Sequence, residues 1–149
     1  METVLAASEI ASDRRDRRLA YALLRILVGI NLIMHGVSRM LMGPSVFAEK
    51  LTAQFGHSPL PLRGVWAFGM VLPAIEALLG MLLLLGLRTR AALVASLFLM
   101  MLLTLGVALV QDWSAAGLQL TYGLVLAALL FLSRYNGWSL DACLHHGKQ

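Results

Sequence analysis

Residues 19–42 read LAYALLRILVGINLIMHGVSRMLM, a run of 24 residues with no acidic side chain and only Arg25, His35 and Arg39 as basic ones. A helix needs about 20 mainly apolar residues to cross the hydrocarbon core of a bilayer. Gly43-Pro44 follows the run, and proline disfavours the helical conformation in the residue before it. The stretch therefore predicts a membrane-spanning helix that ends near residue 42.

Three further apolar runs follow, over about residues 64–87, 89–110 and 118–133. The 149 residues are 59% hydrophobic and only 13% charged, whereas soluble domains are about 25% charged. Short connections between consecutive helices favour antiparallel neighbours. We therefore expect an all-α integral membrane protein, an antiparallel four-helix bundle that occupies residues 19–135.

The first connection is too long for a simple turn and predicts a short helix of its own. Ser45 can cap this helix, in which Phe47, Leu51 and Phe55 share one face, and Gly56 can end it. Such an amphipathic helix is typical of a segment that lies at the outer membrane surface.

Charge sets the expected orientation. The segment 1–18 has four arginines among its last six residues, the turn after residue 87 holds Arg88 and Arg90, and the turn around Asp112 has no basic residue. Because cytoplasmic ends of spanning helices are rich in Lys and Arg, we expect residues 1–18 and the tail 136–149 to be cytoplasmic. The formal net charge of +4 then reflects membrane topology, and we expect no nucleic-acid partner.

One face of the first helix is polar. At about 100° per residue, Asn31, His35, Ser38 and Arg39 fall on one arc, with Arg25 at its margin. An ionisable side chain at the bilayer centre costs about 2.5 to 3.5 kcal/mol on insertion scales, so this face should turn inward. For Arg25 and Arg39 the alternative is that they reach the two headgroup layers.

Glu76 lies near the middle of the second predicted helix. A carboxylate there should be protonated or paired, and both Arg25 and His35 are candidate partners. The sequence leaves open whether the polar groups form a clasp between two helices or handle a ligand, a quinone or protons. Gln119 and Tyr122 on the last helix are secondary candidates for the same site, unless they only bond neighbouring helices.

The sequence contains no self-contained catalytic motif, so whether the protein is an enzyme stays open. A single Cys143 excludes an intrachain disulfide, and the stretch Cys143-Leu144-His145-His146 fits no standard zinc spacing. We therefore expect no metal site. His35 is the single histidine within the predicted spans, so a bis-histidine haem would need a second ligand from a partner.

A scattered set of residues forms a recognisable pattern: Leu24-Arg25, Gly29, His35-Gly36, Arg39, Phe47, Gly56, Pro59, Glu76, Gly80, Leu85 to Ala92, Gly137 and Ser139-Leu140-Asp141. With it the chain resembles the DoxX family of small four-helix bacterial membrane proteins. The resemblance implies a location in the bacterial inner membrane and a link to membrane redox chemistry, because related proteins include a subunit of a thiosulfate:quinone oxidoreductase. Arg39 stands where many DoxX members have lysine.

Three functions are compatible with the sequence. The first is a membrane subunit of a respiratory or redox complex in which Asn31, His35, Arg39 and Glu76 surround a quinone headgroup or a proton route. The second is a noncatalytic accessory subunit that stabilises a larger membrane complex. The third is a transporter of protons or small molecules, which four helices would form only as an oligomer. The expected partners are lipid and either a larger membrane complex or further copies of the chain.

Overall fold

A computed structural model describes the backbone of residues 2–146 and the side chains of residues 12–144. The described part is helical and contains no strand. Its elements are α1 (Glu2–Met42), α2 (Pro44–Gln54), α3 (Leu62–Leu85), α4 (Thr89–Leu109), α5 (Trp113–Phe131), the 3₁₀ turn η1 (Ser133–Tyr135) and α6 (Leu140–His146).

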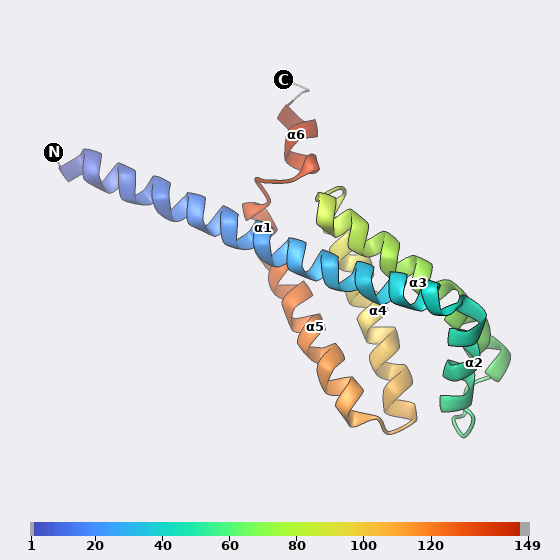
Figure 1. Cartoon of the computed structure of the whole chain (residues 1–149). Helices are drawn as coiled ribbons and strands as arrows, with labels where there is room; N and C mark the ends of the chain where they lie inside the picture. The colour runs from blue at the N-terminus through green and yellow to red at the C-terminus, as the bar shows by residue number, and fades with distance from the viewer. Residues whose placement is uncertain (1, 147–149) are drawn as a thin grey trace.

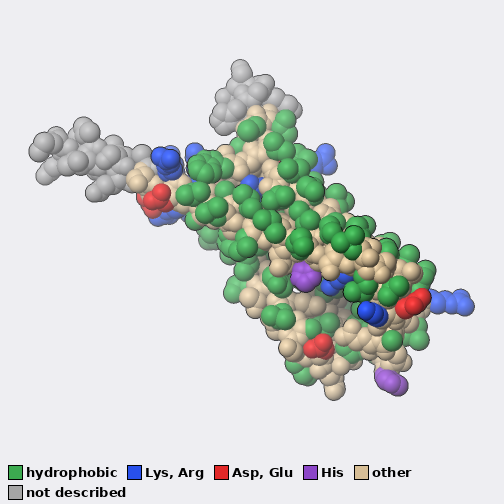
Figure 2. Space-filling view, in the orientation of Figure 1, with side chains coloured by type: hydrophobic (Ala, Val, Ile, Leu, Met, Phe, Trp, Pro, Cys, Tyr) green, Lys and Arg blue, Asp and Glu red, His purple; other side chains and the backbone are tan. Residues whose placement is uncertain are grey.

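Four of the described helices are long and apolar enough to cross a membrane: Ser12–Met42 within α1, and the whole of α3, α4 and α5. Figure 2 shows hydrophobic side chains spread over the whole length of the described bundle, with few charged side chains among them. Figure 1 shows α1 and α3 side by side, and α4 and α5 as a hairpin next to them. The prediction of an all-α, multi-pass membrane bundle is confirmed.

The first helix is longer than the expected span, because it begins at Glu2 and not near residue 19. No proline or glycine interrupts the chain before Gly29. Within the charged segment, Arg17 Nε lies 2.9 Å from an Asp13 carboxylate oxygen one turn earlier, a spacing that supports a helix. The N-terminal turns of α1 therefore project beyond the bundle (Figure 1).

Glycines let α1 and α3 pack backbone against backbone. A Cβ built on Gly36 would lie 2.5 Å from the carbonyl oxygen of Pro73, and one on Gly80 would lie 2.6 Å from the nitrogen of Ile33 and 2.7 Å from the oxygen of Gly29. Side-chain atoms do not fit at such distances. This glycine seam fixes the antiparallel register of α1 on α3, as small residues do between membrane helices.

The seam gives a first prediction: Gly80→Val should lower the free energy of unfolding by about 3 kcal/mol, because backbone atoms of α1 would have to move away. The measurement is unfolding of the purified protein by SDS titration in one detergent. Gly117→Val is the matched control, since a Cβ there meets no atom within 4 Å. Equal stability of the two variants would contradict the tight seam.

Two further helix starts, those of α2 and α5, differ from the expected ones. Gly43, with φ of 98°, precedes α2 and Pro44 is its first residue, so Ser45 is not the cap. Proline suits this position because the first helical N–H has no partner in the helix. The last span begins at Trp113 and not near residue 118, because the Asp112 carboxylate accepts a hydrogen bond from Ala115 N at 3.0 Å and caps the helix.

The segment after α5 folds back onto the turn between α3 and α4. The Asp141 carboxylate accepts hydrogen bonds from the backbone nitrogens of Arg88 and Thr89, both at 2.7 Å, and so caps the N-terminus of α4. The backbone nitrogen of Asp141 donates to the carbonyl oxygen of Gly86 at 3.0 Å. The C-terminal segment and the arginine-bearing turn therefore lie at the same end of the bundle.

Candidate functional site

A cavity of about 200 Å³ lies among α1, α3, α4 and α5. Apolar side chains such as Val28, Leu32, Met100 and Leu103 form much of its wall. Six polar or charged residues complete the lining: Asn31, His35, Arg39, Glu76, Gln119 and Tyr122. We call it the polar cavity. It brings together six of the seven residues that the sequence singles out, and Arg25 lies elsewhere.

The two charges in the cavity are paired with each other. Arg39 Nη1 donates hydrogen bonds to both carboxylate oxygens of Glu76, whose side chain is 4% exposed. The guanidinium of Arg39 also lies 4.7 Å from the centroid of the Phe47 ring, a favourable cation–π distance. The partner of Glu76 is therefore Arg39, and the expected pairing with Arg25 or His35 was wrong.

The register of the glycine seam explains this choice. Gly36 lies opposite Pro73 and Ala77, which places Glu76 at the same height, and Arg39 is one turn further along α1. Arg25 precedes Gly36 by 11 residues, or roughly 16 Å along a helix. The sequence alone could not provide the register, because it does not show which glycines of two helices meet.

Arg25 is held in a separate buried site near the middle of α1, 14 residues before Arg39. The residue is 2% exposed, and its Nη1 donates to the carbonyl oxygen of Leu83 at 2.6 Å while Nη2 donates to that of Trp138 at 2.8 Å. The last carbonyls of a helix carry partial negative charge, which suits a guanidinium. Arg25 thus joins α1, α3 and the C-terminal segment.

Several polar groups of the cavity have no partner within the described part of the chain. Gln119 Oε1 is buried there without a hydrogen bond. The side chains of Asn31, His35 and Tyr122 likewise make no hydrogen bond to a described residue. A buried polar atom that stays unpaired costs about 1 to 3 kcal/mol. These groups, which can both donate and accept, are available to a ligand or to water.

The cavity opens at the side of the bundle. His35 is exposed although it lines the cavity, and α1 makes few contacts with α5. The opening therefore faces the region that lipid occupies around spanning helices. The volume exceeds the roughly 150 Å³ of an apolar cavity known to hold benzene, so it suits one substituted six-membered ring.

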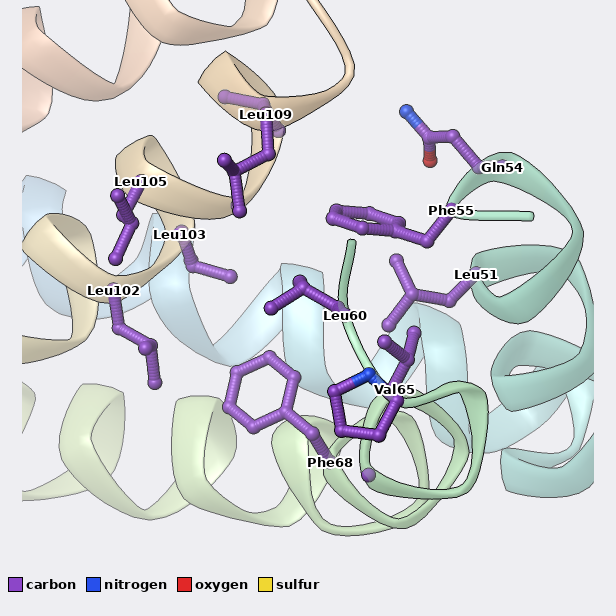
Figure 3. A pocket seen from close by; sticks show the side chains of 14 residues that line it. Leu51, Gln54, Phe55, Leu60, Val65, Phe68, Leu102, Leu103, Leu105 and Leu109 are labelled. Carbon is purple, nitrogen blue, oxygen red and sulfur yellow. The ribbon is translucent and has the colours of Figure 1, made fainter. Parts of the chain in front are cut away.

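A second, larger hollow of about 330 Å³ lies between α2, α3 and α4. Figure 3 shows Phe55 and Leu60 on one side, Phe68 on another and leucines of α4 facing them. Of its fourteen lining residues, Gln54 alone has a polar side chain. We call this hollow the apolar groove. The sequence did not reveal it, because its leucines and phenylalanines follow the same pattern as core residues.

No group of three or more His, Cys, Asp or Glu with the geometry of a metal site occurs among the described residues. The side chains of His145 and His146, which follow Cys143 in the tail, lie outside the described side chains. The expectation that the chain holds no metal therefore stays a prediction.

Comparison with protein families gives one match. The family described as methylamine utilisation protein MauE matches residues 17–118, which is 102 of the 149 residues. The match includes Asn31, His35, Arg39 and Glu76 and ends just before Gln119. No curated protein and no solved structure matches the chain.

The resemblance to the DoxX family was wrong, since the matching family is a different membrane family. Its pattern consists largely of residues with a packing or topological cause. Gly29, Gly36 and Gly80 form the seam, and Gly86 adopts a left-handed conformation with φ of 67° at the end of α3. Membrane helix interfaces are often rich in such small residues, and many helices end with a left-handed glycine. On the extent of its family match, the chain belongs to the family of the methylamine utilisation protein MauE.

Proposed function

We propose that the protein is a membrane accessory subunit of a redox system and that its polar cavity holds the ring of a membrane-soluble ligand of the quinone class. The observation that carries the proposal is the buried, unpartnered Gln119 Oε1 in a ring-sized cavity. Asn31, His35 and Tyr122 line the same space without partners in the described chain.

The chemistry of these side chains fits both redox forms of such a ring. A quinone has two carbonyl oxygens that accept hydrogen bonds, and a quinol has two hydroxyl groups that donate them. A neutral imidazole and a carboxamide each contain a donor and an acceptor, and the tyrosine hydroxyl can do both. His35, Asn31, Gln119 and Tyr122 can therefore bind either form without leaving a buried group unpaired.

The lateral opening and the family support the same proposal. A cavity that opens beside His35 between spanning helices admits a ligand from the bilayer more readily than one from water. The family description concerns the utilisation of methylamine, and the use of an amine as a carbon source requires its oxidation. An accessory membrane subunit near a quinone is compatible with such a system.

We further propose that the protein lies in the bacterial inner membrane with both termini in the cytoplasm. Arg14, Arg15, Arg18 and Arg134 are exposed, and the C-terminal segment binds the turn that carries Arg88. Basic residues thus gather at one end of the bundle, as they do on the cytoplasmic side of membrane proteins. The orientation is tested with Ser45→Cys in a Cys143→Ser background. A thiol reagent that does not cross the membrane should label this variant in intact cells, and absence of labelling would contradict the proposed orientation.

The quinone content of the purified protein tests the proposed function. We expect wild-type protein in mild detergent to retain quinone and His35→Ala to retain about fivefold less, since a lost hydrogen bond costs about 1 kcal/mol. His57→Ala is the matched control, because His57 is exposed in the loop after α2 and should leave the content unchanged. Equal quinone in all three proteins, or none in wild type, would contradict the proposal.

A second function, stabilisation of a larger membrane complex without ligand binding, is favoured by the pairing of Arg25, Arg39 and Glu76. These groups act as clasps inside the chain. If this is the whole role, Glu76→Gln should reduce the amount of assembled complex in native mass spectrometry while quinone content stays at zero in every variant.

A further inference from the structure

The apolar groove adjoins the polar cavity. Leu103 of α4 lines both hollows, so the two hollows share one wall residue. The polar cavity has space for one ring, whereas the groove is larger and has almost no polar lining. The two hollows together have the composition of a site for a molecule with a polar head and a hydrocarbon chain.

The groove also needs an occupant. The groove is open at the protein surface, and an occupant that fills it gains dispersion contacts with the apolar atoms of its wall. Few contacts join α4 to α3, and exposed leucines of α4, including Leu102, Leu105 and Leu109, line the groove. Figure 3 shows these leucines facing Phe68 and Leu60 across the space.

We propose that the apolar groove binds the hydrocarbon chain of the ligand whose ring lies in the polar cavity. This inference rests on the proposed function. It adds that the protein selects ligands with a long apolar chain. Such a chain would move from bulk lipid into a fixed site between α2, α3 and α4. A ring without a chain would occupy only the polar cavity and bind more weakly.

Glycines in the groove wall offer a way to block it. A Cβ on Gly106 would lie 3.3 Å from Cζ of Phe55, and one on Gly64 would lie 3.5 Å from Cγ of Pro61. Leucine at either position would project toward the groove from opposite walls, α4 and α3. Gly117 in α5 has open space around it and provides the matched control.

The experiment compares two probes that share one head, a dimethoxy-methyl-benzoquinone without a chain and its decyl derivative, with protein in nanodiscs of one lipid composition. Quenching of tryptophan fluorescence gives each Kd. We expect Gly106→Leu and Gly64→Leu to weaken the decyl probe about tenfold and to leave the chainless probe unchanged. Gly117→Leu should change neither, and the thermal unfolding midpoint identifies any variant that fails to fold.

The outcomes separate the two proposals. If the decyl probe binds wild type and both groove variants equally, the chain lies in bulk lipid and the groove assignment is wrong, while binding of the chainless probe still supports the proposed function. If the chainless probe does not bind wild type but the decyl probe binds and is weakened by Gly106→Leu, the polar cavity proposal fails and the groove assignment survives. If neither binds wild type, both fail.

Discussion

Arg25→Leu should lower the free energy of unfolding by about 3 kcal/mol. The substitution removes the hydrogen bonds that the guanidinium donates to the carbonyl oxygens of Leu83 and Trp138. A hydrogen bond to a charged group contributes about 1.5 to 3 kcal/mol, and the carbonyl oxygen of Leu83 keeps the bond from Gly86 N. The C-terminal segment should also be held less firmly on the turn between α3 and α4, where the hydrogen bonds of Asp141 remain. SDS unfolding measures the first effect and limited proteolysis after residue 135 the second.

Arg90→Leu is the matched control, because Arg90 is exposed at the same end of the bundle. It removes the same charge and should change the unfolding free energy by less than about 0.5 kcal/mol. If Arg25→Leu unfolds like Arg90→Leu and its C-terminus stays resistant to protease, Arg25 does not hold the three segments together.

Glu76→Leu should cost about 3 kcal/mol, because it leaves the charge of Arg39 without its partner inside the bundle. Removal of one member of a buried ion pair costs about 3 to 5 kcal/mol. We expect the lower end of that range, since the Arg39 side chain is 26% exposed and can turn toward the surface. SDS unfolding in the detergent used for wild type measures the change.

The double variant Arg39→Leu with Glu76→Leu separates charge from packing. It removes both charges, so it should recover at least half of the loss seen in Glu76→Leu. Glu49→Leu controls for the loss of a carboxylate at an exposed position on α2. If the double variant is less stable than Glu76→Leu, the side chains of Arg39 and Glu76 stabilise the bundle by more than the neutralisation of each other's charge.

The bundle itself was predictable because the length of an apolar run shows whether a helix can cross a membrane. The composition of residues 19–42 alone predicts a membrane-spanning helix, and α1 ends at Met42, where Gly43-Pro44 predicts an end. The starts of α1 and α5 were less predictable. A charged segment such as 13–18 can continue a helix through one i,i+4 pair, and the cap at Asp112 depends on a backbone geometry that composition does not show.

The polar residues of the cavity were visible in the sequence because charge and amide groups are rare in apolar spans. Their partners were not. Glu76 pairs with Arg39 because Gly36 and Gly80 set the register of two helices, and a register depends on both sequences at once. The bonds of Arg25 to backbone carbonyls were hidden for a further reason, since every residue has a carbonyl and no side-chain pattern marks the one that will be used.

The most direct test of the ring site is the response of His35 to a bound quinone. Protein labelled with ¹⁵N at its four histidines would be titrated in nanodiscs with the chainless benzoquinone, and His35→Gln assigns the signal by its loss. We predict that the ring nitrogens of His35 shift with added quinone while those of His57 stay in place. An unchanged His35 signal at concentrations that quench tryptophan fluorescence would contradict a ring bound in the polar cavity.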